Sequence, residues 1–165
     1  MFIVDAHLDL AYNAIVKGRD PRLGVARIRA NEPAPEDIAT VGLPEIRRAG
    51  VGLIFATLFV SPASTPFERE PNEFTYETPE QAHHLATAQL DYYRRLVDED
   101  ESLRLVTDLA GLNEVTRSHE SGDKPLLGIV LLMEGADCIR EPQEAEWWYE
   151  RGVRLIGPAW DDTRY

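Results

Sequence analysis

The sequence has a single cysteine, Cys138, among its 165 residues. One cysteine excludes an intrachain disulfide framework and a four-cysteine zinc site, and it fits a reducing cytoplasm. Long hydrophobic runs are also absent, because the longest, residues 51–60, has the length of a strand. A membrane-spanning helix needs about 20 apolar residues. The N-terminus has no basic stretch, and Asp5 interrupts its apolar run at once, so no signal peptide is expected. These features predict a soluble cytoplasmic protein.

Basic residues are scarce: 17 lysines and arginines face 29 aspartates and glutamates, which gives a formal net charge of −12. Nucleic acids and anionic membranes both require a basic patch that neutralises phosphates, so neither is expected as a partner. The hydrophobic share of 44% and the charged share of 28% are ordinary for a globular protein. The length suggests one domain or part of a larger one.

Apolar runs alternate with helical patterns along the chain. Near-continuous apolar runs, unlike alternating ones, are typical of strands that are buried on both faces of a parallel sheet. The strands are expected at residues 2–4, 51–60, 126–133 and 153–156, with a weaker one at 103–107.

The helices have clear start and stop signals. Residues 78–81 (TPEQ) offer an N-cap, a proline at the first helical position and a capping-box partner, and Asp108 can cap a later helix. Two more helices, at 44–49 and 142–151, end at Gly50 and Gly152, where a left-handed residue is favoured. Strands and helices in this order predict an α/β fold. Residues 18–37 and 61–78, rich in proline and charge, are expected to form long loops.

The first chemical signal is His7-Leu8-Asp9, which follows the first expected strand. Residues two apart on an extended chain point to the same face, and α/β folds place their active sites at the carboxyl ends of strands. An imidazole and a carboxylate suit Zn²⁺, Mn²⁺ or a similar divalent ion. The alternative for this short motif is a surface turn and helix cap.

The second signal is Glu134, directly after the apolar run at 126–133. A carboxylate there would be costly to bury without a cation or hydrogen-bond donors. If both strands belong to one parallel sheet, His7, Asp9 and Glu134 converge at one rim as a partial metal site. The alternative for Glu134 is a solvent-exposed residue that starts a loop.

Three segments resemble motifs of the membrane (renal) dipeptidase family: residues 5–10 (DAHLDL), 128–135 (GIVLLMEG) and 149–160 (YERGVRLIGPAW). The resemblance implies a (β/α)₈ TIM-type barrel with two zinc ions that hydrolyses dipeptides. It implies that His7 and Asp9 bind one zinc and that Glu134, the candidate catalytic residue, bridges both. A metal-bound hydroxide would then attack the dipeptide amide.

Two features depart from the family pattern. Trp160 stands where the family commonly has a histidine that helps to bind the substrate, so Trp160 is the candidate substrate-binding residue, with packing as the alternative. The length is the larger departure, because a complete barrel needs about 250 residues. Residues 1–165 are therefore expected to be the N-terminal half of a single metallo-hydrolase barrel domain, with about four β/α units, a minor strand, an incomplete metal site and no second domain.

Two other functions stay open on the sequence alone. The barrel and its metal could act on a non-dipeptide amide or an ester, because of Trp160. The chain could instead be a non-catalytic fragment whose exposed sheet edges pair with another chain, including a second copy of itself. Other histidines are expected to have no functional role, with His83 and His84 on a solvated helix face and His119 in an exposed loop.

Overall fold

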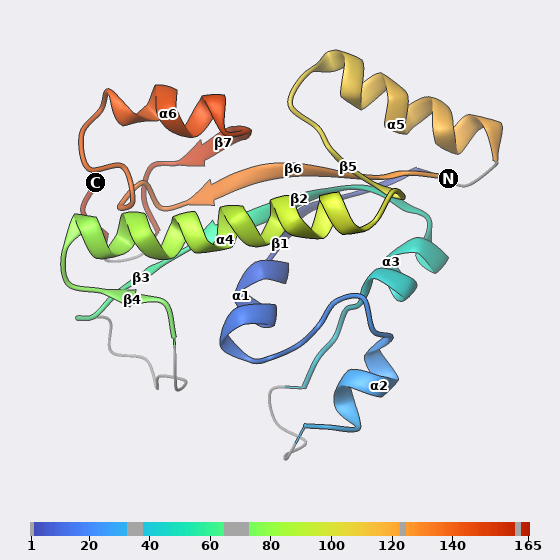
Figure 1. Ribbon diagram of the computed structural model, residues 1–165, viewed down its shortest axis with the longest axis horizontal. Coiled ribbons are helices and arrows are strands. Elements are labelled where there is room, and N and C mark those ends of the chain that lie inside the picture. Colours follow the sequence, from blue (N-terminus) through green and yellow to red (C-terminus); the bar gives the residue numbers. More distant parts are fainter. Residues whose placement is uncertain (1, 33–37, 65–72, 123–124, 161–162) are drawn as a thin grey trace.

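The computed structural model describes residues 2–32, 38–64, 73–122, 125–160 and 163–165. Strands and helices alternate through most of this part of the chain (Figure 1). The elements are β1 (Ile3–Leu8), α1 (Leu10–Val16), α2 (Val25–Arg29), α3 (Leu43–Ala49), β2 (Val51–Phe59), β3 (Ser61–Pro62), β4 (Thr75–Tyr76), α4 (Pro79–Glu99), β5 (Leu103–Leu105), α5 (Leu109–Ser121), β6 (Leu127–Glu134), α6 (Glu144–Glu150) and β7 (Val153–Gly157).

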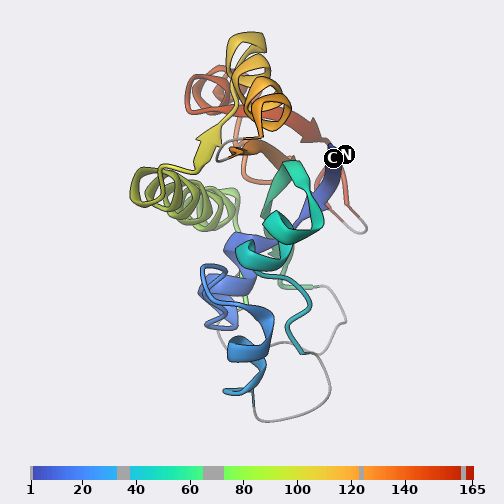
Figure 2. The ribbon, with the colours of Figure 1, turned by 90° about the vertical axis from the view of Figure 1, so that its right-hand side faces the viewer.

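The main sheet is parallel throughout, which confirms the α/β class. Its order is β1-β2-β6-β5, and β7 also pairs with β6. Strand β5 pairs with the first half of β6, from Leu127 to Ile129, and β7 with the second half, from Leu131 to Glu134. In Figure 2, β1 in dark blue and β5 in yellow lie at opposite sides of the sheet. Because the strands are parallel, all their carboxyl ends point to one edge.

Burial on both faces is confirmed for the inner strands only. Nearly every residue of β2 and β6 is buried or half-buried. The outer strands β1 and β7 differ, since Val4 is 48% exposed and Leu155 is 42% exposed. Each of these two strands has one pairing neighbour among the described residues, so apolar composition alone overstates their burial.

The long helix α4 starts as the sequence predicts, with Thr78 and Gln81 forming a reciprocal capping box. It runs along one face of the sheet (Figure 1), and its buried residues Ala86, Leu90 and Tyr93 belong to the main core. A smaller cluster includes Val115 of α5 and Val130 of β6. Both predicted stop glycines, Gly50 and Gly152, have positive φ.

The expected long loops contain short elements. Helix α2 lies within residues 18–37, and β3 pairs in parallel with β4 within residues 61–78. Residues 33–37 and 65–72 of these segments lie outside the described part of the chain. No helix among the described residues combines the length and apolarity needed to cross a membrane.

Candidate metal centre

His7 and Glu134 meet at the carboxyl edge of the main sheet. His7 is on the outer strand β1, and Glu134 is the last residue of the inner strand β6. The imidazole Nε2 lies 2.8 Å from Oε2 of Glu134. The His7 side chain is 46% exposed and that of Glu134 is 19% exposed, so the pair is open to solvent from the imidazole side.

Asp9 completes the cluster at the start of α1. Its Oδ2 lies 3.8 Å from Nδ1 of His7. The hydroxyl of Thr57, which is fully buried in β2, donates a hydrogen bond to Oδ1 of Asp9. The Asn13 side chain donates to the Asp9 carbonyl oxygen at 2.8 Å, which holds the turn between β1 and α1.

One potential ligand atom from each of His7, Asp9 and Glu134 lies within 4.8 Å of the other two. Ligand atoms about 2.1 Å from a tetrahedral zinc ion are about 3.4 Å apart, so small side-chain movements would close the set around an ion. One imidazole and two carboxylates are donors that Zn²⁺ and Mn²⁺ accept. The donor set and its spacing therefore fit a divalent metal ion.

The carboxylates also control the protonation of His7. Burial alone lowers the pKa of the imidazole, but the hydrogen bond to Glu134 and the negative charges of Asp9, Glu134 and Asp5 outweigh it. The net effect raises the pKa of His7 above its ordinary value. In the metal-free protein this cluster therefore attracts a cation, either a proton on His7 or an ion between the three side chains.

Trp160 lies next to this edge, beyond β7. Its ring packs edge-to-face against Phe59, with ring centroids 5.2 Å apart, and Phe59 is the β2 residue paired with Glu134. Its backbone N–H donates to the hydroxyl of Thr163 at 3.1 Å. The packing alternative is thus observed, and substrate binding by Trp160 stays a prediction.

Two of the other histidines, His83 and His119, have structural roles that differ from those expected. His83 is buried, its Nδ1 lies 3.1 Å from the carbonyl oxygen of Cys138, and its ring contacts Trp148. His119 lies in α5 rather than in a loop, and its Nε2 is 2.8 Å from the carbonyl oxygen of Leu126. The exposed position of His84 agrees with the prediction.

Thr57 is the site residue that sequence reasoning missed. The sequence does mark this residue, since Thr57 is the only polar side chain in the apolar strand Val51–Phe59. A hydroxyl at a fully buried position needs a partner, and the nearest one at the sheet edge is the Asp9 carboxylate.

The sequence matches no known family profile. It is 29% identical over 96 residues to the uncharacterized protein in the PQQ-III 3′ region of Acinetobacter calcoaceticus, a match that covers 58% of this chain and 28% of that protein.

Solved structures show the same fold. The dipeptidase AC, a metallopeptidase of family M19, superposes with a TM-score of 0.67 at 20% identity, over 97% of this chain and 43% of its own. A metallopeptidase from Rhodobacter sphaeroides, liganded with a phosphinate mimic of the dipeptide L-Ala-D-Ala, gives the same score and identity over 97% and 46%. The probable dipeptidase PvdM from Pseudomonas aeruginosa gives 0.62 at 14% identity over 96% and 34%. The predicted resemblance is thus confirmed at the level of the fold, and the chain spans less than half the length of each of these proteins.

Proposed function

We propose that this chain carries part of the metal centre of a dipeptidase-like hydrolase. The observation that supports the proposal most directly is the cluster of His7, Asp9 and Glu134, brought together from β1 and β6 at the carboxyl edge of a parallel sheet. That edge is where α/β enzymes build their active sites.

Each residue of the cluster would have its own role in holding the metal ions. His7 and Asp9 would hold one ion, and Glu134, within reach of both, would bridge to a second. Thr57 keeps the Asp9 carboxylate oriented, as partners behind metal ligands commonly do. A divalent ion held there would supply polarisation of a carbonyl oxygen and a lower pKa for a bound water. Glu134, the less exposed of the two carboxylates, would accept a proton at a carboxylate oxygen.

The sheet fits an incomplete barrel of the (β/α)₈ type, with residues 1–165 as its N-terminal half. Four strand positions, filled by β1, β2, β6 and the β5/β7 pair, are parallel, and both outer strands carry exposed apolar residues. Further strands on either side would cover those residues. The complete two-zinc site would then require ligands beyond His7, Asp9 and Glu134 from the strands that close the barrel.

The proposed substrate is a dipeptide, in keeping with the dipeptide mimic bound to the Rhodobacter sphaeroides metallopeptidase. Trp160, packed on Phe59 beside Glu134, would line the substrate's path with an aromatic surface and one N–H donor. Zinc as the ion, cytoplasmic location and a dipeptide as the small-molecule partner all belong to this proposal.

Metal content tests the cluster directly. The protein should retain zinc after dialysis, measured by mass spectrometry, and His7→Ala should lose most of it. His84→Ala is the matched control, because this exposed helix histidine is outside the cluster. Equal zinc in wild type and His7→Ala would refute the metal centre.

A substrate panel tests the reaction. The zinc-loaded chain, and a chain extended to the length of the similar dipeptidases, should be assayed with L-Ala-D-Ala, with other dipeptides and with simple amides and esters. Hydrolysis of dipeptides that is lost in Glu134→Gln supports the proposal. Turnover of other amides or esters without any dipeptide turnover would favour the broader amidohydrolase.

A further inference from the structure

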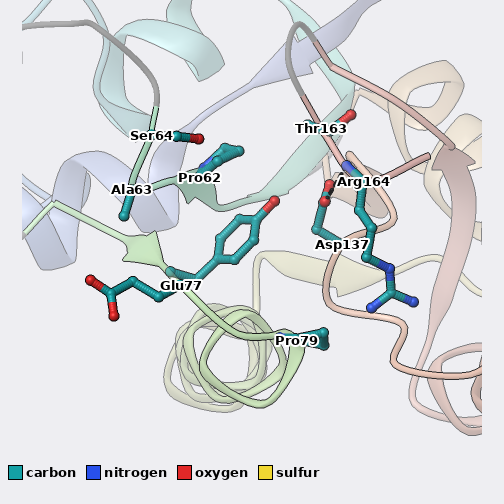
Figure 3. A pocket seen from close by; sticks show the side chains of 9 residues that line it. Pro62, Ala63, Ser64, Glu77, Pro79, Asp137, Thr163 and Arg164 are labelled. Carbon is teal, nitrogen blue, oxygen red and sulfur yellow. Dashed lines mark hydrogen bonds between the residues drawn. The ribbon is translucent and has the colours of Figure 1, made fainter.

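A pocket of about 620 Å³ lies beside the proposed metal centre, between the β3–β4 pair, the start of α4 and the turn after β6 (Figure 3). None of the three candidate metal ligands lines it. Its walls are Pro62, Ala63, Ser64, Tyr76, Glu77, Pro79, Asp137, Thr163 and Arg164. Nothing in the proposed chemistry of His7, Asp9 and Glu134 uses this space.

Asp137 is the unusual member of the pocket wall. It is only 1% exposed, although it carries a carboxylate. Its Oδ1 accepts a hydrogen bond from the backbone N–H of Arg164 at 2.8 Å. Among the described residues its other oxygen, Oδ2, has no hydrogen-bond partner of good geometry, although the Tyr76 hydroxyl lies close enough to interact with the Asp137 carboxylate. Buried carboxylate oxygens are nearly always hydrogen-bonded, so this oxygen can accept a further donor at the pocket wall.

The basic side chain of the pocket wall, Arg164, is engaged by partners other than Asp137. The Nη2 atom of Arg164 donates to the carbonyl oxygens of Ile139 and Arg140, at 3.2 and 3.0 Å, and the guanidinium stacks on Tyr165. Figure 3 shows the Arg164 guanidinium turned away from Ser64 and Ala63, on the far side of the pocket. Asp137 therefore has no ion-pair partner among the described residues within salt-bridge distance.

The remaining walls indicate the rest of the ligand. Pro62 and Pro79 supply apolar surface, and Tyr76 adds an aromatic ring with a hydroxyl. Burial, and after it a hydrogen bond to the Asp137 carboxylate and the charge of that carboxylate, raise the pKa of Tyr76 above its ordinary value, so its hydroxyl stays protonated. An aliphatic chain can lie along the prolines and the ring while a cationic end reaches Asp137.

We propose that this pocket binds a primary ammonium group at the end of an aliphatic chain, held by Oδ2 of Asp137. A guanidinium binds a carboxylate best through both oxygens, and here Oδ1 is already engaged by Arg164. An ammonium is a compact charge that a single oxygen and nearby hydroxyls can hold. A divalent cation would need several oxygen ligands together, and Figure 3 shows the other carboxylate of the pocket wall, Glu77, turned away from Asp137.

The ammonium could belong to a free amine or to the basic side chain of a substrate. The pocket adjoins the metal centre through Gly135, which follows Glu134 and whose added Cβ would lie 3.1 Å from Oδ2 of Asp137. The substrate source rests on the proposed function, whereas binding of a free amine does not.

Binding of n-butylammonium, measured by calorimetry or by protein NMR on the 165-residue chain, tests the pocket without any metal. We expect saturable binding, with n-butanol, the uncharged analogue, at least about tenfold weaker, because a charge-assisted hydrogen bond is lost. Asp137→Asn keeps the acceptor for Arg164 but removes the charge, and should weaken n-butylammonium by a similar factor. Asp91→Asn, on the exposed side of α4, should leave the affinity unchanged.

Equal affinity for n-butylammonium and n-butanol, or no saturable binding of the amine, overturns the proposal. So does an unchanged amine affinity in folded Asp137→Asn. If that variant does not fold, the comparison of the two ligands in wild type decides, together with Tyr76→Phe, which should weaken the amine more than the alcohol.

A kinetic comparison distinguishes a basic substrate side chain from a free amine as the group that occupies the pocket. In a zinc-loaded, active chain, kcat/KM is compared for dipeptides that carry lysine or norleucine. A lysine preference that disappears in Asp137→Asn assigns the pocket to the substrate, and an unchanged ratio assigns it to a free amine. If neither dipeptide is hydrolysed, the proposed function fails while the amine-binding measurement still decides the pocket.

Discussion

The imidazole Nε2 of His7 lies 2.8 Å from Oε2 of Glu134, although 127 positions separate the two residues in the sequence. The parallel pairing of β1 with β2 and of β2 with β6 causes this meeting, because it brings the carboxyl ends of all three strands to one edge. His7 lies between Asp5 and Leu8, where the register of β1 against β2 shifts. The contact therefore depends on the parallel sheet and on this irregularity in β1.

The first prediction concerns the protonation of His7 in the metal-free protein. Its raised pKa keeps the imidazole charged at pH values above its ordinary value of 6.5. Glu134→Gln removes the largest of the favourable interactions and should lower the pKa of His7, measured by NMR titration of the ring protons. Glu150→Gln, at the exposed end of α6, is the control and should leave it unchanged.

The sign of the stability effect follows from the same shift. The His7–Glu134 contact contributes fully to folding below the unfolded pKa of histidine and loses that contribution as pH rises through the raised folded value. Urea unfolding of wild type and Glu134→Gln should therefore differ more at acidic than at alkaline pH. A difference that grows with pH would contradict the assignment.

The second prediction concerns Thr57, whose hydroxyl holds Asp9. Thr57→Val preserves the volume but removes that donor, so the Asp9 carboxylate should lose its fixed orientation. We expect zinc affinity to fall by about tenfold, the lower range for residues behind a metal ligand. Calorimetric titration measures it. Thr87→Val is the matched control, since the Thr87 hydroxyl bonds only to the carbonyl oxygen of His83 one turn earlier.

The third prediction separates backbone strain from steric conflict at Gly135, where φ is 82°. Gly135→Ala should destabilise the protein by more than the ~1–2 kcal/mol expected for a left-handed alanine, because its Cβ would also press on Asp137. Gly122 has φ of 73°, and a Cβ there would meet no described residue within 4 Å, so Gly122→Ala should show the strain alone. Urea denaturation compares the two, and equal losses would rule out the steric part.

The fourth prediction concerns the single thiol. Cys138 is 1% exposed, and burial raises its pKa to about 12. At pH 8 a disulfide reagent should react with native protein far more slowly than with unfolded protein, because both access and thiolate are lacking. The thiol favours the folded state less as pH rises above its unfolded pKa. Rapid labelling of the native protein at pH 8 would contradict this burial.

Local signals in the sequence predicted most of the fold. The capping box at Thr78, the cap at Asp108 and the glycines that end α3 and α6 act within a few residues, so their outcome does not depend on distant contacts. The three site residues could also be predicted to converge, because each follows an apolar strand and parallel strands share an edge. Whether they bind metal stays a prediction.

Other features depended on partners that the sequence does not mark. His83 appeared solvated beside His84, yet its side of α4 faces Trp148 of α6, 65 positions away. The exposure of Val4 and Leu155 reflects their place on outer strands, which apolar composition cannot distinguish from inner ones. The burial of Asp137 could not be predicted from the sequence, because it depends on the contact between the turn after β6 and the backbone of Arg164.

The location of the ligands on the sheet has a consequence for hydrogen exchange. Glu134 ends β6, which has hydrogen-bonded neighbours on both sides, whereas His7 is on β1, which has one neighbour in the described part of the chain. Amide protons of β1 should therefore exchange with solvent sooner than those of β6, since opening an outer strand breaks fewer contacts. An ion bound by both His7 and Glu134 would link β1 to the more strongly hydrogen-bonded strand β6. Zinc should then slow exchange along β1 most, and deuterium uptake would report metal occupancy strand by strand.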